Sequence, residues 1–129
     1  MSRKILVVDD NTTNVRLMRV VLDTQGYEVY EALDADQAIA MLDRIVPDLI
    51  LMDITMPGMD GLTLTRQLKA DPRFKAIPVI AVSSLAMKGD DEKALAAGCD
   101  AYITKPIDTR RLPAQVLEWI GAGAKKSPD

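Results

Sequence analysis

Three short apolar runs, each followed at once by polar or turn-forming residues, most constrain what this chain can fold into. They span residues 5–8, 49–52 and 79–82. Unbroken apolar runs of this length, closed by turn residues, are typical of strands buried on both faces of a parallel sheet. The shorter, mixed runs 27–32 and 101–104 predict two further strands. The sequence therefore indicates a sheet whose central strands are covered on both sides.

Segments with apolar residues at helical spacing separate the predicted strands. Capping residues at 11–14 and Asp34 start two of them, and Gly26 and Gly98 are expected to end helices. We expect helices over residues 12–25, 35–46, 61–70, 90–97 and about 109–120. Strand and helix thus alternate five times. A helix that connects two parallel strands crosses over the sheet in a right-handed sense. The alternation therefore predicts an α/β fold with a parallel sheet between two helical layers.

Composition limits the class of function. With 129 residues the chain fits one domain, and its net charge of −3 gives no reason to expect a nucleic-acid or anionic membrane partner. The single cysteine, Cys99, fits a reducing compartment, so a cytoplasmic protein is expected. The chain has no histidine, which rules out histidine-activated nucleophiles and imidazole metal ligands within it. Any chemistry must rely on carboxylates, hydroxyls and lysines.

Polar side chains follow four of the predicted strands. Asp9 and Asp10 follow the first, Asp53 ends the third, Ser83 follows the fourth and Lys105 follows the fifth. The carboxyl ends of parallel strands share one edge of the sheet, and open α/β sheets bind ligands in the crevice there. We therefore expect these five side chains to lie around one crevice.

The acidic residues of this group predict a metal site. Three carboxylates close together repel one another, and a divalent cation relieves the repulsion. An all-oxygen donor set favours a hard ion, so Mg²⁺ is expected, bound by Asp9, Asp10 and Asp53 and by a backbone carbonyl such as that of Thr55.

The same crevice suits phosphoryl transfer. Asp53 lies on the central strand and is the expected nucleophile, forming an aspartyl-phosphate. Lys105 and the metal would stabilise charge on the phosphoryl oxygens, and the Ser83 hydroxyl would donate to one of them.

Each of these residues also has an ordinary explanation when taken alone. The Asp9-Asp10 pair resembles a helix N-cap, and Asp53 precedes a Pro-Gly turn. Lys105 suits a solvated loop, and Ser83 a loop or cap hydroxyl. Their joint placement at strand ends favours the functional interpretation.

Together these motifs resemble the receiver domains of response regulators in two-component systems. The resemblance covers about residues 3–120 and rests on Val8-Asp9-Asp10-Asn11, on residues 51–61, on Ala81-Val82-Ser83-Ser84 and on Lys105-Pro106. It implies a (βα)5 flavodoxin-like, CheY-like doubly wound sandwich with strand order 2-1-3-4-5. The receiver would span residues 1–122, with 123–129 as a disordered tail. Residues 81–90 are similar to a single-domain regulator of this family.

The resemblance also implies a function. Asp53 would accept a phosphoryl group from the phosphohistidine of a sensor histidine kinase or a histidine phosphotransfer protein. Asp10, Asp53 and the Thr55 carbonyl would bind Mg²⁺ with help from Asp9, while Ser83 and Lys105 would contact the phosphoryl group. The rotamer of Tyr102 would report the state of Ser83.

A downstream protein would then bind the face built from the last two helices and the last strand. The resemblance implies that this chain is itself a signalling switch, which catalyses only its own phosphorylation and dephosphorylation. Neither a nucleic acid nor a membrane is an expected partner.

Two features depart from the family pattern. The switch hydroxyl is commonly threonine and here is Ser83, and Pro113 falls inside the last predicted helix, so that helix should start late or kink. The family also suggests a cis peptide between Lys105 and Pro106.

Several alternatives stay open at this point. A receiver belonging to a hybrid kinase or a larger regulator is one alternative to a single-domain regulator. A haloacid-dehalogenase-like phosphatase would need a second aspartate where Thr55 stands. A flavodoxin-like cofactor binder would need a phosphate loop after the first strand, where the sequence has Asp9-Asp10.

Overall fold

A computed structural model describes residues 3–54, 61–83, 90–104 and 107–125 of the protein. These residues contain one parallel sheet with the strand order β2-β1-β3-β4-β5. The strands are β1 (Lys4–Val8), β2 (Glu28–Ala32), β3 (Leu49–Asp53), β4 (Val79–Ser83) and β5 (Ala101–Thr104). The predicted fold and strand order are confirmed.

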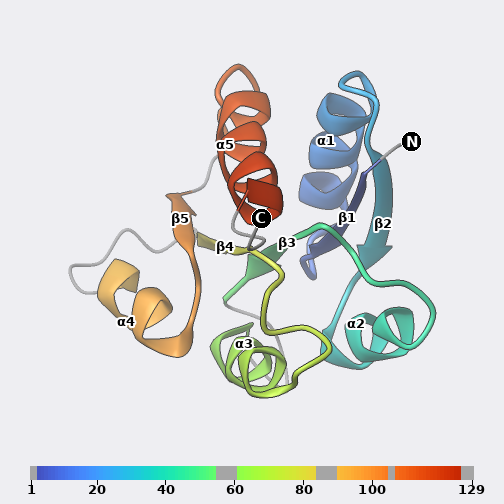
Figure 1. The fold of residues 1–129 in the computed structure, drawn as a ribbon. Coiled ribbons are helices and arrows are strands. Elements are labelled where there is room, and N and C mark those ends of the chain that lie inside the picture. Colours follow the sequence, from blue (N-terminus) through green and yellow to red (C-terminus); the bar gives the residue numbers. More distant parts are fainter. Residues whose placement is uncertain (1–2, 55–60, 84–89, 105–106, 126–129) are drawn as a thin grey trace.

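Helices cover both faces of the sheet (Figure 1). On one face lie α1 (Thr12–Asp23) and α5 (Leu112–Lys125), side by side. On the other lie α2 (Ala35–Leu42), α3 (Gly61–Ala70) and α4 (Asp90–Ala97). Successive residues of a strand point to opposite faces, so Leu6 and Val8 pack under α2 and α3, whereas Ile5 and Val7 pack under α1 and α5. This two-sided burial explains the unbroken apolar runs.

The predicted capping residues act as expected. The Asn11 side chain accepts a hydrogen bond from the Asn14 amide at 3.1 Å, and Asp34 accepts one from the Gln37 amide at 2.8 Å. Gly26 and Gly98 have φ angles of +87° and +108°. These left-handed conformations favour glycine, which accounts for the turns after α1 and α4.

The second helix is shorter than the sequence predicted. It ends at Leu42, and the amides of Arg44 and Ile45 then both donate to the Met41 carbonyl, which closes a turn. Val46 is 61% exposed. The prediction of a helix to residue 46 was wrong because Pro47 disfavours the helical conformation at the residue before it.

The last helix begins later and ends later than predicted. It starts at Leu112, which places Pro113 in the first turn, where its missing amide hydrogen costs no helical hydrogen bond. A late start, rather than a kink, thus accommodates this proline. The helix continues to Lys125, into the predicted tail, and residues 126–129 lie outside the described part of the chain.

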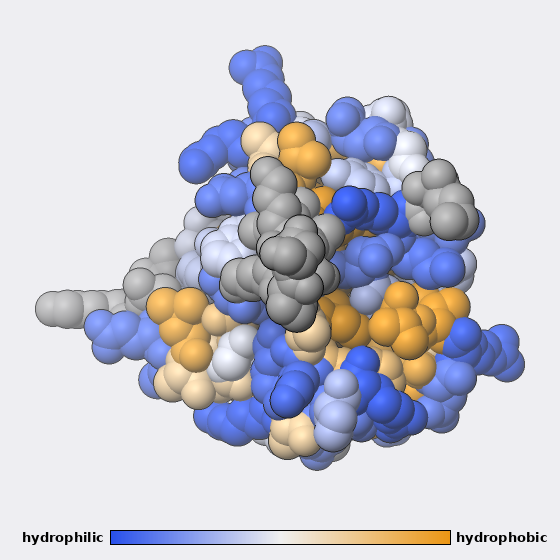
Figure 2. All heavy atoms as spheres, in the orientation of Figure 1, coloured by the Kyte–Doolittle hydropathy of each residue, from blue (hydrophilic) through white to orange (hydrophobic). Residues whose placement is uncertain are grey.

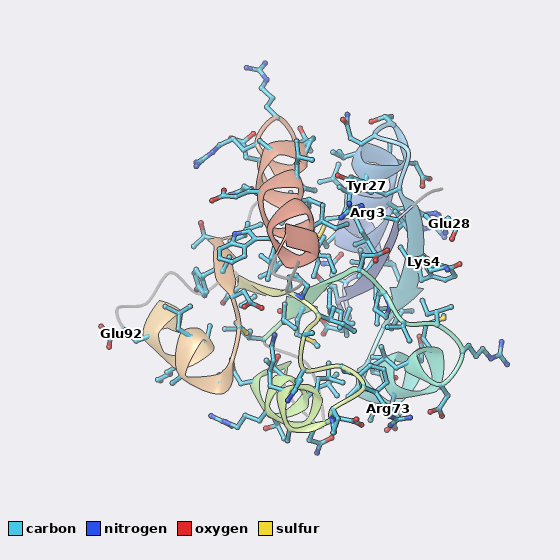
Figure 3. All side chains as sticks on the ribbon, in the orientation of Figure 1. Arg3, Lys4, Tyr27, Glu28, Arg73 and Glu92 are labelled. Carbon is cyan, nitrogen blue, oxygen red and sulfur yellow. The ribbon has the colours of Figure 1, made fainter. Side chains whose placement is uncertain are left out.

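The edge of the sheet at the amino ends of the strands has its own polar contacts. The Arg3 guanidinium donates to the Ile120 carbonyl at 2.9 Å, which joins the start of β1 to α5. The Glu28 amide donates to the Arg3 carbonyl at 2.9 Å, and Lys4 is the register partner of Glu28; Figure 3 labels these residues.

The face of the molecule drawn in Figure 2 is largely polar. Figure 2 shows its hydrophobic side chains in small, separate groups, one of them over α4. No helix in the described ranges is both long and apolar enough to cross a membrane.

Candidate functional site

Three acidic side chains meet at the carboxyl edge of the sheet. Asp9 directly follows β1 and is fully buried, Asp10 is exposed, and Asp53 ends β3 with 3% of its surface exposed. One carboxylate oxygen of each lies within 4.8 Å of the others. The structure thus brings together three of the residues that the sequence selected.

Strand register accounts for this convergence. Val8 of β1 is paired with Met52 of β3, so Asp9 and Asp53 stand one residue further along neighbouring strands. The Asp9 amide donates to the Ala32 carbonyl at 3.0 Å, which holds it beside β2 as well. The Asp9 carboxylate accepts the Asn11 amide at 2.9 Å.

The alternative role of the acidic pair as a helix cap is wrong. The N-cap of α1 is Asn11, whose side chain accepts the Asn14 amide. Asp9 and Asp10 therefore precede the cap, and Asp10 faces solvent next to the buried pair.

The donor set fits a divalent cation. The three carboxylates supply hard, anionic ligands, and one oxygen of each lies within 4.8 Å of the others. The exposed Asp10 leaves the site accessible from solvent. Such a set, with waters completing an octahedron, is the arrangement that Mg²⁺ prefers. Thr55, the source of the expected carbonyl ligand, lies outside the described residues.

Ser83 lies at the same edge as Asp53. It is the last residue of β4 and is fully buried, and Asp53 is paired with the residue before it, Val82. The Ile54 amide donates to the Val82 carbonyl at 3.1 Å, so the ladder between these strands continues past Asp53. Lys105, and with it the peptide bond to Pro106, lies outside the described residues.

Tyr102 is partly buried on β5. It is paired with Ala81 and packs against the hydrophobic cluster under α2, α3 and α4. It also lines a hollow of about 240 Å³ between β5 and α5, together with Asp108 and Arg111. Its predicted role as a reporter of Ser83 stays a prediction.

Two residues beside the site were given no role there by the sequence. A Cβ at Gly61 would overlap the Asp53 carbonyl oxygen and would lie 2.9 Å from the Ile54 Cα. Thr65, one helical turn later, is fully buried and donates its hydroxyl to the Gly61 carbonyl at 2.7 Å. Gly61 belongs to the motif at residues 51–61 but was expected only to begin a helix, and no sequence pattern singled out Thr65.

Comparison with known proteins agrees with this geometry. Residues 5–117 match the family model described as the response regulator receiver domain. The response regulator PleD of Caulobacter vibrioides is 47% identical over 116 residues, and the chain spans only 26% of PleD's length. The polar-differentiation response regulator DivK of Brucella abortus is 40% identical over 121 residues, which cover 94% of this chain and 98% of DivK.

Solved structures show the same likeness. A CheY-like receiver domain protein of Methanospirillum hungatei is 30% identical with a TM-score of 0.90, covering 98% of this chain and 100% of the other. The receiver domain of a sensor histidine kinase from Pseudomonas aeruginosa PAO1 is 35% identical with a TM-score of 0.85, covering 94% of this chain and 99% of the other. That structure has a magnesium ion coordinated in its active-site cleft.

The profile match spans most of the chain, and DivK aligns along nearly its whole length. The chain therefore belongs to the response regulator receiver domain family, the phospho-accepting switches of two-component signalling.

Proposed function

We propose that Asp53 accepts a phosphoryl group from the phosphohistidine of a sensor histidine kinase or a histidine phosphotransfer protein, in a reaction that needs Mg²⁺. The convergence of Asp9, Asp10 and Asp53 within 4.8 Å carries this proposal. Asp53 is the natural acceptor because it ends a central strand and is almost completely buried, which shields an acyl phosphate from water.

The surrounding residues have distinct proposed roles. Asp10, Asp53 and the Thr55 carbonyl would hold Mg²⁺, with Asp9 assisting. The bound ion neutralises negative charge where the carboxylate meets the phosphoryl group. An oxygen of Asp53 then bonds to phosphorus while the bond to the donor's imidazole nitrogen breaks, and the donor takes up a proton. Lys105 and Ser83 would contact the phosphoryl oxygens.

Phosphorylation would act as a switch. It adds charge and acceptor oxygens at Asp53, which attract the Ser83 hydroxyl. The movement of Ser83 toward the phosphoryl group would leave space that the Tyr102 side chain can enter. The burial of Ser83 at the end of β4 and the partial burial of Tyr102 on the adjacent strand support this route. A downstream protein that prefers one state of the α4-β5-α5 face would shift the population. We place this signalling in the cytoplasm.

The similarity to DivK along almost its full length supports a regulator whose output is a protein contact. The similarity to a quarter of PleD supports the alternative, a receiver within a larger regulator or hybrid kinase. Phosphotransfer profiling against the histidine kinases of the source organism would identify the donor in either case.

Phosphorylation by acetyl phosphate tests the proposal. We expect the protein to gain one phosphoryl group, stable in acid and labile in base, only when Mg²⁺ is present. Asp53→Asn should abolish the modification, because an amide is not a nucleophile toward phosphorus. Intact-protein mass spectrometry measures it.

Asp34→Asn is the matched control. Asp34 lies outside the acidic cluster, and an asparagine at this position can still cap α2. It should be phosphorylated like the wild type. Modification of Asp53→Asn at the wild-type rate would disprove the assignment. Sustained release of phosphate from a small ester would instead support the phosphatase class.

A further inference from the structure

One buried polar side chain lies beyond the roles proposed so far. Among the residues that the structure describes, the buried polar side chains are Asp9, Asp53, Ser83 and Thr65. The first three form the site, whereas Thr65 lies on α3. A buried hydroxyl is costly unless it is hydrogen-bonded. The hydrogen bonds of the Thr65 hydroxyl therefore indicate what this residue does.

The Thr65 hydroxyl has a partner on each side. It donates to the Gly61 carbonyl at 2.7 Å, one turn earlier in α3. The Cys99 thiol, from the turn between α4 and β5, lies 3.8 Å from the same oxygen and donates to it. Because the thiol donates, the hydroxyl's own hydrogen is directed at Gly61. The bond thus fixes the first turn of α3.

That first turn rests directly on the backbone at Asp53. A Cβ at Gly61 would overlap the Asp53 carbonyl oxygen and would approach the Asp53 carbonyl carbon and the Ile54 Cα at 2.9 Å each. All three neighbouring atoms belong to the backbone, so no change of side-chain rotamer would relieve the overlap. A shift of Gly61 toward β3 would therefore displace the backbone that carries Asp53, and a shift away would remove its support.

The opposite end of α3 is fixed independently. The Lys69 ammonium donates to the Ile77 carbonyl at 2.8 Å and to the Asp100 carboxylate at 3.0 Å. Asp100 also accepts the Val79 amide at 2.8 Å, so Lys69 is tied to the start of β4. Because this end is held, losing the Thr65 bond would loosen the first turn rather than move the whole helix.

From these contacts we infer that Thr65 is a positioning residue for Asp53, acting through Gly61. This inference rests on the proposed phosphorylation of Asp53. The hydroxyl holds the first turn of α3 against the end of β3, which keeps the carboxylate aligned with the metal site and the incoming phosphorus. Displacements near 1 Å can cost about 100-fold in rate, so smaller shifts should cost less but remain measurable.

Two substitutions at Thr65 separate its hydroxyl from its volume. Thr65→Val keeps the shape and removes the hydroxyl, whereas Thr65→Ser keeps the hydroxyl. At saturating Mg²⁺, we expect Thr65→Val to lower the rate constant for phosphorylation by acetyl phosphate about 3- to 10-fold. Thr65→Ser should stay within about 2-fold of the wild type. Rates are compared where circular dichroism shows every variant folded, so a role in stability alone would not change them.

Thr24→Val is the matched control. It removes the same atoms from an exposed threonine whose hydroxyl donates to the Val21 carbonyl at 2.6 Å at the end of α1. Its rate should equal that of the wild type.

A second pair of variants tests the contact without changing Thr65. Gly61→Ala should lower the rate about tenfold or more, because the added methyl must displace backbone at Asp53. Gly26→Ala is its control, since a Cβ at Gly26 meets nothing within 4 Å and suffers only from the positive φ. If Thr65→Val does not fold, the Gly61 pair decides.

The outcomes distinguish the two proposals. A wild-type protein that is never phosphorylated would refute the proposed function itself. A phosphorylated wild type with Thr65→Val or Gly61→Ala at an unchanged rate would overturn the positioning role alone. Equal slowing in Thr65→Val and Thr65→Ser would also overturn it, because the hydroxyl would then not be the cause.

Discussion

Two neighbouring helices on the same face of the sheet, α3 and α4, are held in different ways. Helix α3 buries Leu64 and Leu68 and is tied down at its far end by Lys69. Within residues 92–97 of α4, the buried side chains are Ala94 and Ala97, whereas Leu95 is 54% exposed. Figure 3 shows Glu92 at the outer edge of this helix.

The two helices differ in how much apolar surface they bury against the sheet. Burying a leucine side chain contributes about 1.5–3 kcal/mol, and an alanine much less. The helix that begins against Asp53 is therefore the firmly packed one, and the helix on the proposed output face is lightly packed. Segments with few buried apolar contacts open and move at lower free-energy cost. A phosphorylation signal would thus move α4 more easily than α3.

The largest expected effect compares a leucine from each helix. Leu64→Ala should lower the free energy of unfolding by about 2–5 kcal/mol, because Leu64 is 1% exposed and its removal leaves a cavity. Leu95→Ala should change it by less than about 0.5 kcal/mol. Urea denaturation followed by circular dichroism measures both. Equal losses would contradict the contrast between the helices.

A smaller effect is expected from removing the contacts of Lys69 at the end of α3. Lys69→Met should cost about 1–3 kcal/mol, because it leaves the part-buried Asp100 carboxylate without its cation and the Ile77 carbonyl without a donor. Arg73→Met is the control, since its side chain is 67% exposed and its pairing with Asp71 is a surface contact. If both variants lost the same stability in urea, Lys69 would be no more than a surface ion pair.

The smallest effect concerns pH at the junction of the two helices. Burial raises the pKa of the Cys99 thiol, so the folded state holds the proton more tightly than the unfolded state. That contribution is fully present below the unfolded pKa and is lost as the pH rises toward the folded one. Stability should therefore fall by at most about 1.4 kcal/mol one pH unit above the thiol's ordinary pKa. Cys99→Ala should remove this part of the decline, and an unchanged pH profile would refute the assignment.

Much of the fold was predictable because its signals are local. The runs at β1, β3 and β4 are apolar throughout because both faces of these strands are buried, and Asn11 and Asp34 cap helices with their own side chains. The meeting of Asp9, Asp10 and Asp53 was predictable too. Parallel strands necessarily place their carboxyl ends at one edge, so the parallel direction of the strands implies it.

The sequence by itself thus determined the layers and the acidic edge of this protein, and the family resemblance supplied the strand order. The tertiary structure alone decided why Thr65 is buried and how closely Gly61 approaches Asp53. The thiol beside Thr65 and the carboxylate beside Lys69 lie 34 and 31 residues away along the chain. No local pattern encodes such contacts, because they exist only after the helices have packed on the sheet.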